Sequence, residues 1–184
     1  MEATETLMDE HRAIERLLDS LELAADRLDA GESVRPGFFL EAAEFIRDFA
    51  DGCHHRKEEG LLFPALEAAG MPRESGPIGV MLHEHDAGRA FTKAMREAAG
   101  RLQDGDAAAK SAITANARGY AALLRQHIRK EDTILFRMAE QFIEGAARDQ
   151  LTAAFERVGR EETGAGVHGK YLALLEGLEQ EARG

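Results

Sequence analysis

The chain has 184 residues, 44% of them hydrophobic, which suits a single domain with a sizeable apolar core. Its formal net charge of −11 argues against a general nucleic-acid binder, because affinity for phosphates needs a basic surface. We expect a cytoplasmic protein, since no apolar run is long enough to span a membrane, the N-terminus lacks the pattern of a secretory signal, and Cys53 is the only cysteine.

The first predicted element is an amphipathic helix over about residues 6–28. Leu7, His11 and Ile14 fall on one stripe of this helix, so His11 is expected to point at the core. The second predicted helix covers about residues 36–69, and Pro64 within it predicts a kink.

A turn-rich passage at residues 70–77 separates the chain into two halves, and two more helices are predicted after it. These helices span about residues 78–102 and 107–142. Two long and two shorter helices with short connections favour an all-α fold, an up-down-up-down antiparallel four-helix bundle over residues 1–145. Residues 146–184 are predicted to form a short C-terminal helical extension packed on the bundle.

Both halves carry the same pattern, a Glu-His pair followed on the next helix by His-x-x-x-Glu. The residues are Glu10-His11 with His54 and Glu58, then Glu84-His85 with His127 and Glu131. Positions i and i+4 of a helix lie on one face, so each half presents an imidazole and a carboxylate together. Such a pairing, made twice, is how a helical bundle builds a two-metal site.

The other polar residues near these motifs have simpler interpretations. Arg56-Lys57 and Arg129-Lys130 are predicted to lie on solvated helix faces, and Cys53 to fill the core. Tyr120 lies on the same helix face as His127 and could donate to an oxygen that bridges the metals or fill the core, and we expect it to fill the core. A metal-free interior with four imidazoles and two carboxylates would cost several kcal/mol unless those groups were paired. The pattern therefore favours a metal site over an ordinary polar core.

The pattern resembles the hemerythrin-like family, the HHE cation-binding domains, over about residues 6–142. The likeness rests on Glu10-His11, His54-His55-x-Lys57-Glu58-Glu59-x-x-Leu62-Phe63-Pro64, Glu84-His85 with Arg89, and His127-Ile128-x-Lys130-Glu131-Asp132-x-x-Leu135-Phe136. The resemblance implies a non-haem di-iron centre with two iron ions, oxo- or hydroxo-bridged. It also implies that His11 and His54 hold one iron, that His85 and His127 hold the other, and that Glu58 and Glu131 bridge the pair.

Three neighbouring residues leave alternatives open. On a helix His55 projects beyond Glu58 on the side away from His54, so we predict it as a ligand of the second iron. Its alternative role is a hydrogen bond to a bridging carboxylate. Asp132 is the alternative to Glu131 as a bridge, while His83 is expected to face away from the core.

The resemblance implies a protein that binds or senses O2, NO, peroxide or iron, with no nucleic-acid or membrane partner. The alternative is a di-iron oxidoreductase that consumes peroxide or nitric oxide, or that repairs iron–sulfur clusters. A metal-free helical interaction module is the third hypothesis. The sequence does not choose among the ligands, nor does it determine the oligomeric state.

Overall fold

The computed structural model describes the backbone of residues 1–164 and 167–184 and the side chains of residues 1–161 and 169–184. The described residues form helices and no strand, which confirms the predicted all-α class. The elements are α1 (Glu2–Asp29), α2 (Pro36–Phe45), η1 (Ile46–His55), η2 (Glu58–Leu62), α3 (Phe63–Ala68), α4 (Gly76–Gln103), η3 (Ala107–Ala109), α5 (Lys110–Lys130), η4 (Glu131–Leu135), α6 (Phe136–Phe142), α7 (Gly145–Gly164) and α8 (Val167–Arg183).

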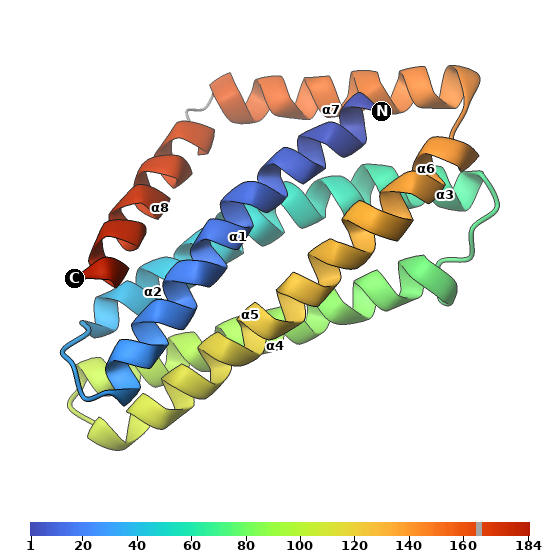
Figure 1. Cartoon of the computed structure of the whole chain (residues 1–184). Coiled ribbons are helices and arrows are strands. Elements are labelled where there is room, and N and C mark those ends of the chain that lie inside the picture. Colours follow the sequence, from blue (N-terminus) through green and yellow to red (C-terminus); the bar gives the residue numbers. More distant parts are fainter. Residues whose placement is uncertain (165–166) are drawn as a thin grey trace.

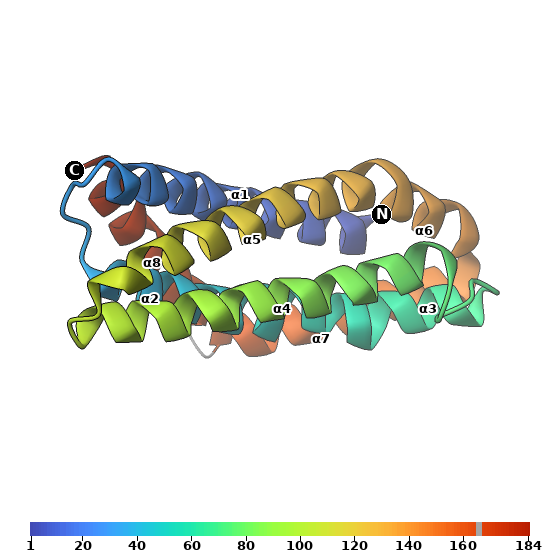
Figure 2. The same ribbon diagram turned by 90° about the horizontal axis from the view of Figure 1, so that it is seen from below.

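Within residues 1–142, these elements join into four long helical runs that lie side by side (Figures 1 and 2). The runs are α1, the continuous stretch 36–68, α4, and the continuous stretch 110–142. Helix α5 packs against α1 and α4, and α2 packs against α4. Local chemistry agrees with the boundaries, because Pro36 and Pro77 lie in first turns and Gly70 ends the second run at φ +100°.

Both runs that carry a His-x-x-x-Glu motif have a π-helical turn that begins at the Glu of the motif, and the first run is also π-helical over Ile46–His55. The N–H of Phe63 donates to the carbonyl of Glu58, five residues back, and the N–H of Phe136 donates to Glu131 in the same way. The expected kink at Pro64 therefore takes the form of a π turn. Proline is not its sole cause, because the second half has Arg137 at the equivalent position and still makes the turn.

The apolar core is divided into two clusters, one on each side of the polar motifs. On α1, Leu7 belongs to one cluster and Ile14 to the other, with His11 between them. On α5–η4, Leu124 and Leu135 belong to different clusters and flank His127 in the same way. The motif residues therefore form a polar layer inside an otherwise apolar bundle.

The last two helices each add apolar side chains to one of these clusters. Leu151 and Phe155 of α7 join the cluster that contains Leu7, while Leu175 and Leu178 of α8 join the other. Helix α8 lies against α1 and α2 (Figure 1). None of the described helices combines the length and apolar character needed to cross a membrane.

Candidate metal centre

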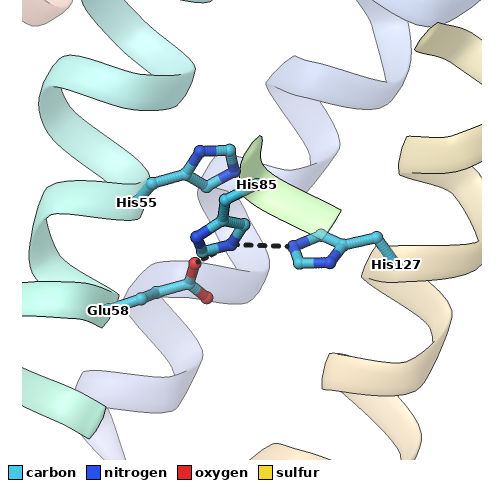
Figure 3. A group of neighbouring side chains, drawn as sticks. All are labelled: His55, Glu58, His85 and His127. Carbon is cyan, nitrogen blue, oxygen red and sulfur yellow. Dashed lines mark hydrogen bonds and ion pairs between the residues drawn. The ribbon is translucent and has the colours of Figure 1, made fainter. Parts of the chain in front are cut away.

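The structure brings all seven predicted ligand residues together in the polar layer. They form two groups whose donor atoms lie within 4.8 Å of one another, and every member is buried. One group is His55, Glu58, His85 and His127 (Figure 3), and the other is His11, His54, Glu58 and Glu131. Glu58 belongs to both groups, and the imidazoles divide between them as the resemblance implied. Ligation of a metal by these seven residues stays a prediction.

Both carboxylates touch imidazoles of both groups. The Glu131 Oε2 atom lies 3.2 Å from Nε2 of His11 and 3.2 Å from Nε2 of His127. Glu58 uses its two oxygens separately, with Oε1 3.6 Å from Nε2 of His54 and Oε2 3.4 Å from Nε2 of His85. Each carboxylate therefore stands between the two groups, which is the position that a bridging ligand needs.

The outer nitrogen of every one of these imidazoles contacts a further carboxylate. The Nδ1–oxygen distances are 2.7 Å for His11 to Asp132, 3.0 Å for His54 to Glu10, 2.8 Å for His55 to Asp51, 2.8 Å for His85 to Glu59, and 3.0 Å for His127 to Glu84. An ionised carboxylate only accepts hydrogen bonds, so Nδ1 is the donor in each pair. In the neutral imidazole, Nε2 then carries a lone pair that points into the polar layer. A carboxylate behind the outer nitrogen orients metal-binding histidines in many sites.

Several inward-pointing atoms have no hydrogen-bond partner of their own. These atoms are Nε2 of His11, His54 and His55 and both carboxylate oxygens of Glu58 and Glu131. The Nε2 atoms of His85 and His127 lie 3.2 Å apart, so in the absence of a metal one of them carries a proton that the other accepts. Buried polar groups without partners are costly. Because a cation accepts lone pairs from imidazoles and carboxylates alike, this donor set fits metal ions.

Without a metal, two of these imidazoles would be protonated and positively charged at neutral pH. Burial alone would lower the pKa of His11, but the hydrogen bond with Asp132 and the nearby carboxylate of Glu131 outweigh burial and raise the pKa to about 10. Burial is outweighed at His85 as well, where Glu58 and Glu59 raise the pKa to about 9.

The pKa values of His55 and Glu58 are both lowered. Burial, together with the neighbouring charge of His85, keeps the pKa of His55 well below its usual value, so this imidazole is neutral. Glu58 is buried too, yet the charges of His54 and His85 hold its pKa well below the ordinary range. A metal ion would therefore meet the ionised carboxylate of Glu58 and would have to displace protons from His11 and His85.

Cationic side chains lie behind all five outer carboxylates, because Arg89 contacts both Glu59 and Asp51. Lys57 binds Glu10 and Lys130 binds Glu84, and these equivalent pairs come from the two halves. Arg12 binds Asp132, and Arg89 binds Glu59 at 2.7 Å. Arg56 and Arg129 are exposed as predicted, and Lys130 is 34% exposed. The prediction that Lys57 lies on a solvated face was wrong, because its side chain is only 2% exposed. Each lysine turns inward to balance a carboxylate that is itself fixed on a histidine.

These contacts change the pKa values of the outer carboxylates. Burial raises the pKa of Glu84, but the hydrogen bonds from His127 and Lys130 outweigh it and bring the value to about 2. At Glu59 the hydrogen bond from His85 has the largest effect, and the pKa is also about 2. Both groups therefore stay ionised at neutral pH and keep their imidazoles oriented.

The open alternatives receive different answers. His55 lies in the group of His85 and His127, and its ring stacks on His85 at a centroid distance of 3.8 Å. The residue at the equivalent position of the second half of the chain is Ile128. Asp132 contacts the outer nitrogen of His11 and lies outside both groups, whereas Glu131 lies inside. His83 is exposed, as expected.

The motifs did not predict that the outer carboxylates contact the outer nitrogens, and Asp132 was considered only as an alternative bridge. Their signal was visible, because Glu10 and Glu84 recur in the paired Glu-His motifs and Glu59 and Asp132 each follow a predicted bridging residue. Asp51 had no counterpart in the second half, where the equivalent residue is Leu124. The repeated Leu-Phe pair also has a place, since Phe63 stacks on His85 and Phe136 stacks on His11.

Comparison with known proteins agrees with this geometry. The model of the hemerythrin HHE cation binding domain matches residues 2–139, three quarters of the chain. The chain belongs to this family. The paired His and Glu groups lie within the matched HHE region, which belongs to a class of cation-binding domains that typically bind iron.

The HHE chain also resembles curated mycobacterial proteins. It is 27% identical over 154 residues to an uncharacterized protein of Mycobacterium tuberculosis and to one of Mycobacterium bovis. These alignments cover 84% of this chain and 60% of each relative, so the chain spans less than two thirds of their length. No solved structure matches the chain.

Proposed function

We propose that this HHE chain is a non-haem di-iron protein that binds O2, NO or peroxide at a carboxylate-bridged centre. We further propose that residues 1–145 form an up-down-up-down bundle around the centre and that residues 146–184 are an extension packed on it. The observation that carries the proposal is the position of Glu58 and Glu131, each in contact with imidazoles of both groups. Two separate single-metal sites would not need shared carboxylates.

In this proposal the two ions have unequal imidazole sets. His11 and His54 hold one ion, while His55, His85 and His127 hold the other, and the two carboxylates serve both. Imidazole and carboxylate suit iron. The ion on the His11 side would therefore meet fewer protein donors than the other. When bound, the iron pair supplies electron transfer and Lewis acidity, and the chain supplies donor orientation through its outer carboxylates.

Metal analysis of the purified protein, loaded with Fe²⁺ without air, tests this proposal. We expect two iron ions per chain in the wild type and fewer than one in Glu58→Ala, because that substitution removes a ligand of both ions. His83→Ala is the matched control, since it removes an exposed imidazole from α4 and should retain both ions. Full iron content in Glu58→Ala would contradict a bridged pair. Absorption spectra after addition of O2, NO or peroxide would then identify the ligand.

A further inference from the structure

One side chain, Arg89, contacts two of the outer carboxylates. Its Nη2 atom donates to Oε1 of Glu59 at 2.7 Å, and its Nε atom lies 3.3 Å from Oδ1 of Asp51. The same Glu59 oxygen accepts from Nδ1 of His85, and the same Asp51 oxygen accepts from Nδ1 of His55. A single guanidinium therefore stands behind two of the three imidazoles in the group drawn in Figure 3, which we call the three-imidazole group.

The shape of arginine explains how one residue serves both carboxylates. A guanidinium is planar and presents five N–H donors in a fixed fork, so two acceptors can lie on different edges of it. The remaining edge is used as well, because Nη1 of Arg89 donates to Asp86 at 3.0 Å. Asp86 lies three residues earlier on α4, so this contact anchors the guanidinium to its own helix.

The group with two imidazoles is held differently. Behind its imidazoles, Arg12 binds Asp132 and Lys57 binds Glu10. Each of these carboxylates thus has a cation of its own. Loss of one cation on this side would leave the other carboxylate paired, whereas loss of Arg89 would release two carboxylates together.

Arg89 also connects the three-imidazole group to solvent. Its side chain is 39% exposed, and together with Asp51 it lines a groove of about 760 Å³ between α2–η1 and α4. The imidazoles of His55 and His85 are both buried. The orientation of two buried rings therefore depends on a side chain that water can reach.

We propose that Arg89 is the positioning residue of the three-imidazole group and sets the affinity for the metal ion on that side alone. It holds Asp51 and Glu59 against the outer nitrogens, so that Nε2 of both imidazoles stays directed at the ion. Without it, two like charges would face each other and turn toward water in the groove, which would free both rings to rotate. This inference rests on the proposed function, because it concerns how one of the two proposed ions is held.

Stepwise titration of metal-free protein with Co²⁺, followed by visible absorption, tests this role. We expect two ions per chain in the wild type. In Arg89→Ala one ion should bind about 10–100-fold more weakly, the effect typical of a lost partner behind a metal ligand, while the other keeps its affinity. Arg12→Ala should weaken the other ion instead, so the double variant should weaken both.

The matched control is Arg96→Ala. Arg96 is an exposed cation of the same helix and lines the same groove, and within the described part of the chain it contacts none of the outer carboxylates. Both affinities should therefore stay at the wild-type values. Unchanged binding in Arg89→Ala, or equal weakening of both ions, would overturn the inference.

Arg89→Lys separates positioning from charge. Lysine keeps the positive charge as a compact ammonium group, which lacks the fork that holds two carboxylates in place. We expect the same ion to be weakened, though less than in Arg89→Ala. Wild-type affinity in Arg89→Lys would mean that charge alone matters and would overturn the inference, and this variant decides the question if Arg89→Ala does not fold.

The two proposals fail in different proteins. Fewer than two ions in the wild type would contradict the di-iron proposal. Two ions in the wild type, with no selective weakening in the Arg89 variants, would overturn this inference and leave the di-iron proposal standing.

Discussion

The same hydrogen-bonded triad occurs in both halves of the protein but at different depths. Glu10 links His54 to Lys57, and Glu84 links His127 to Lys130. The charged pair of the first half is almost completely buried, whereas Lys130 in the second half is 34% exposed. Charge pairs contribute differently at these depths, because water cannot compensate a buried charge that has lost its partner.

This difference predicts unequal costs for equivalent substitutions. Glu10→Ala should lower the free energy of unfolding of metal-free protein by about 3–5 kcal/mol, since it removes a buried carboxylate that is bonded to both His54 and Lys57. Glu84→Ala should cost clearly less, because water can reach Lys130. Urea unfolding of both variants provides the measurement. Equal losses would show that the depth of the pair has no effect.

The histidine pKa values predict how metal binding and stability change together with pH. His11 and His85 have pKa values of about 10 and about 9 in the metal-free fold, above the unfolded value of about 6.5. Their protonation therefore stabilises the metal-free fold fully below pH 6.5, and this contribution is lost as pH rises through 9 to 10. A metal on Nε2 replaces the proton and removes the dependence.

We therefore expect the gain in Tm on metal loading to grow between pH 6.5 and about 9.5. Zn²⁺ is a suitable probe because it has no redox chemistry. Thermal unfolding of metal-free and zinc-loaded protein across this range makes the comparison. Parallel pH curves for the two forms would contradict proton displacement at His11 and His85.

At the scale of the elements, a π turn begins at each of the two proposed bridging carboxylates. Glu58 and Glu131 begin η2 and η4, and their carbonyls accept from the N–H five residues later. Such turns are rare and are frequent at functional sites. The sequence predicted one continuous helix through each motif, since the apolar spacing there is compatible with a helix. The sequence did not predict the π turns, because the only local signal was Pro64, and the second half makes the same turn with Arg137 in that position.

The boundaries of the helices were predictable from local start and end signals in the sequence. Pro36 starts the second run, Asp106 accepts a hydrogen bond from the N–H of Ala108 at the start of η3, and Gly70 ends α3. The inward direction of Lys57 was not predictable. Its neighbours in sequence are charged, and its partner Glu10 comes from another helix.

At the scale of the whole molecule, α8 completes the core beside the metal layer. Leu175 is fully buried in the cluster that also contains Leu17 and Tyr120. Arg16 of α1 binds Glu179 through two hydrogen bonds of 2.8 Å, which hold α8 in place. The extension and the bundle should therefore unfold together.

Leu175→Ala tests this dependence. We expect a loss of about 2–5 kcal/mol in a single unfolding transition, with the iron content unchanged. Leu23→Ala is the control, because Leu23 is 39% exposed and its loss should change stability by no more than about 0.5 kcal/mol. Two transitions in calorimetry, or no loss in Leu175→Ala, would mean that α8 folds independently of the bundle.

The sequence by itself determined the helices, the paired His and Glu on one face, and the family, because these depend on spacing over a few residues and on motifs in order. Only the tertiary structure decided which carboxylate meets each Nδ1, that Asp132 lies outside the groups while Glu131 lies inside, and that Lys57 is buried. These features join residues on different helices, so the distances between packed helices set them, and local spacing carries no information about those distances.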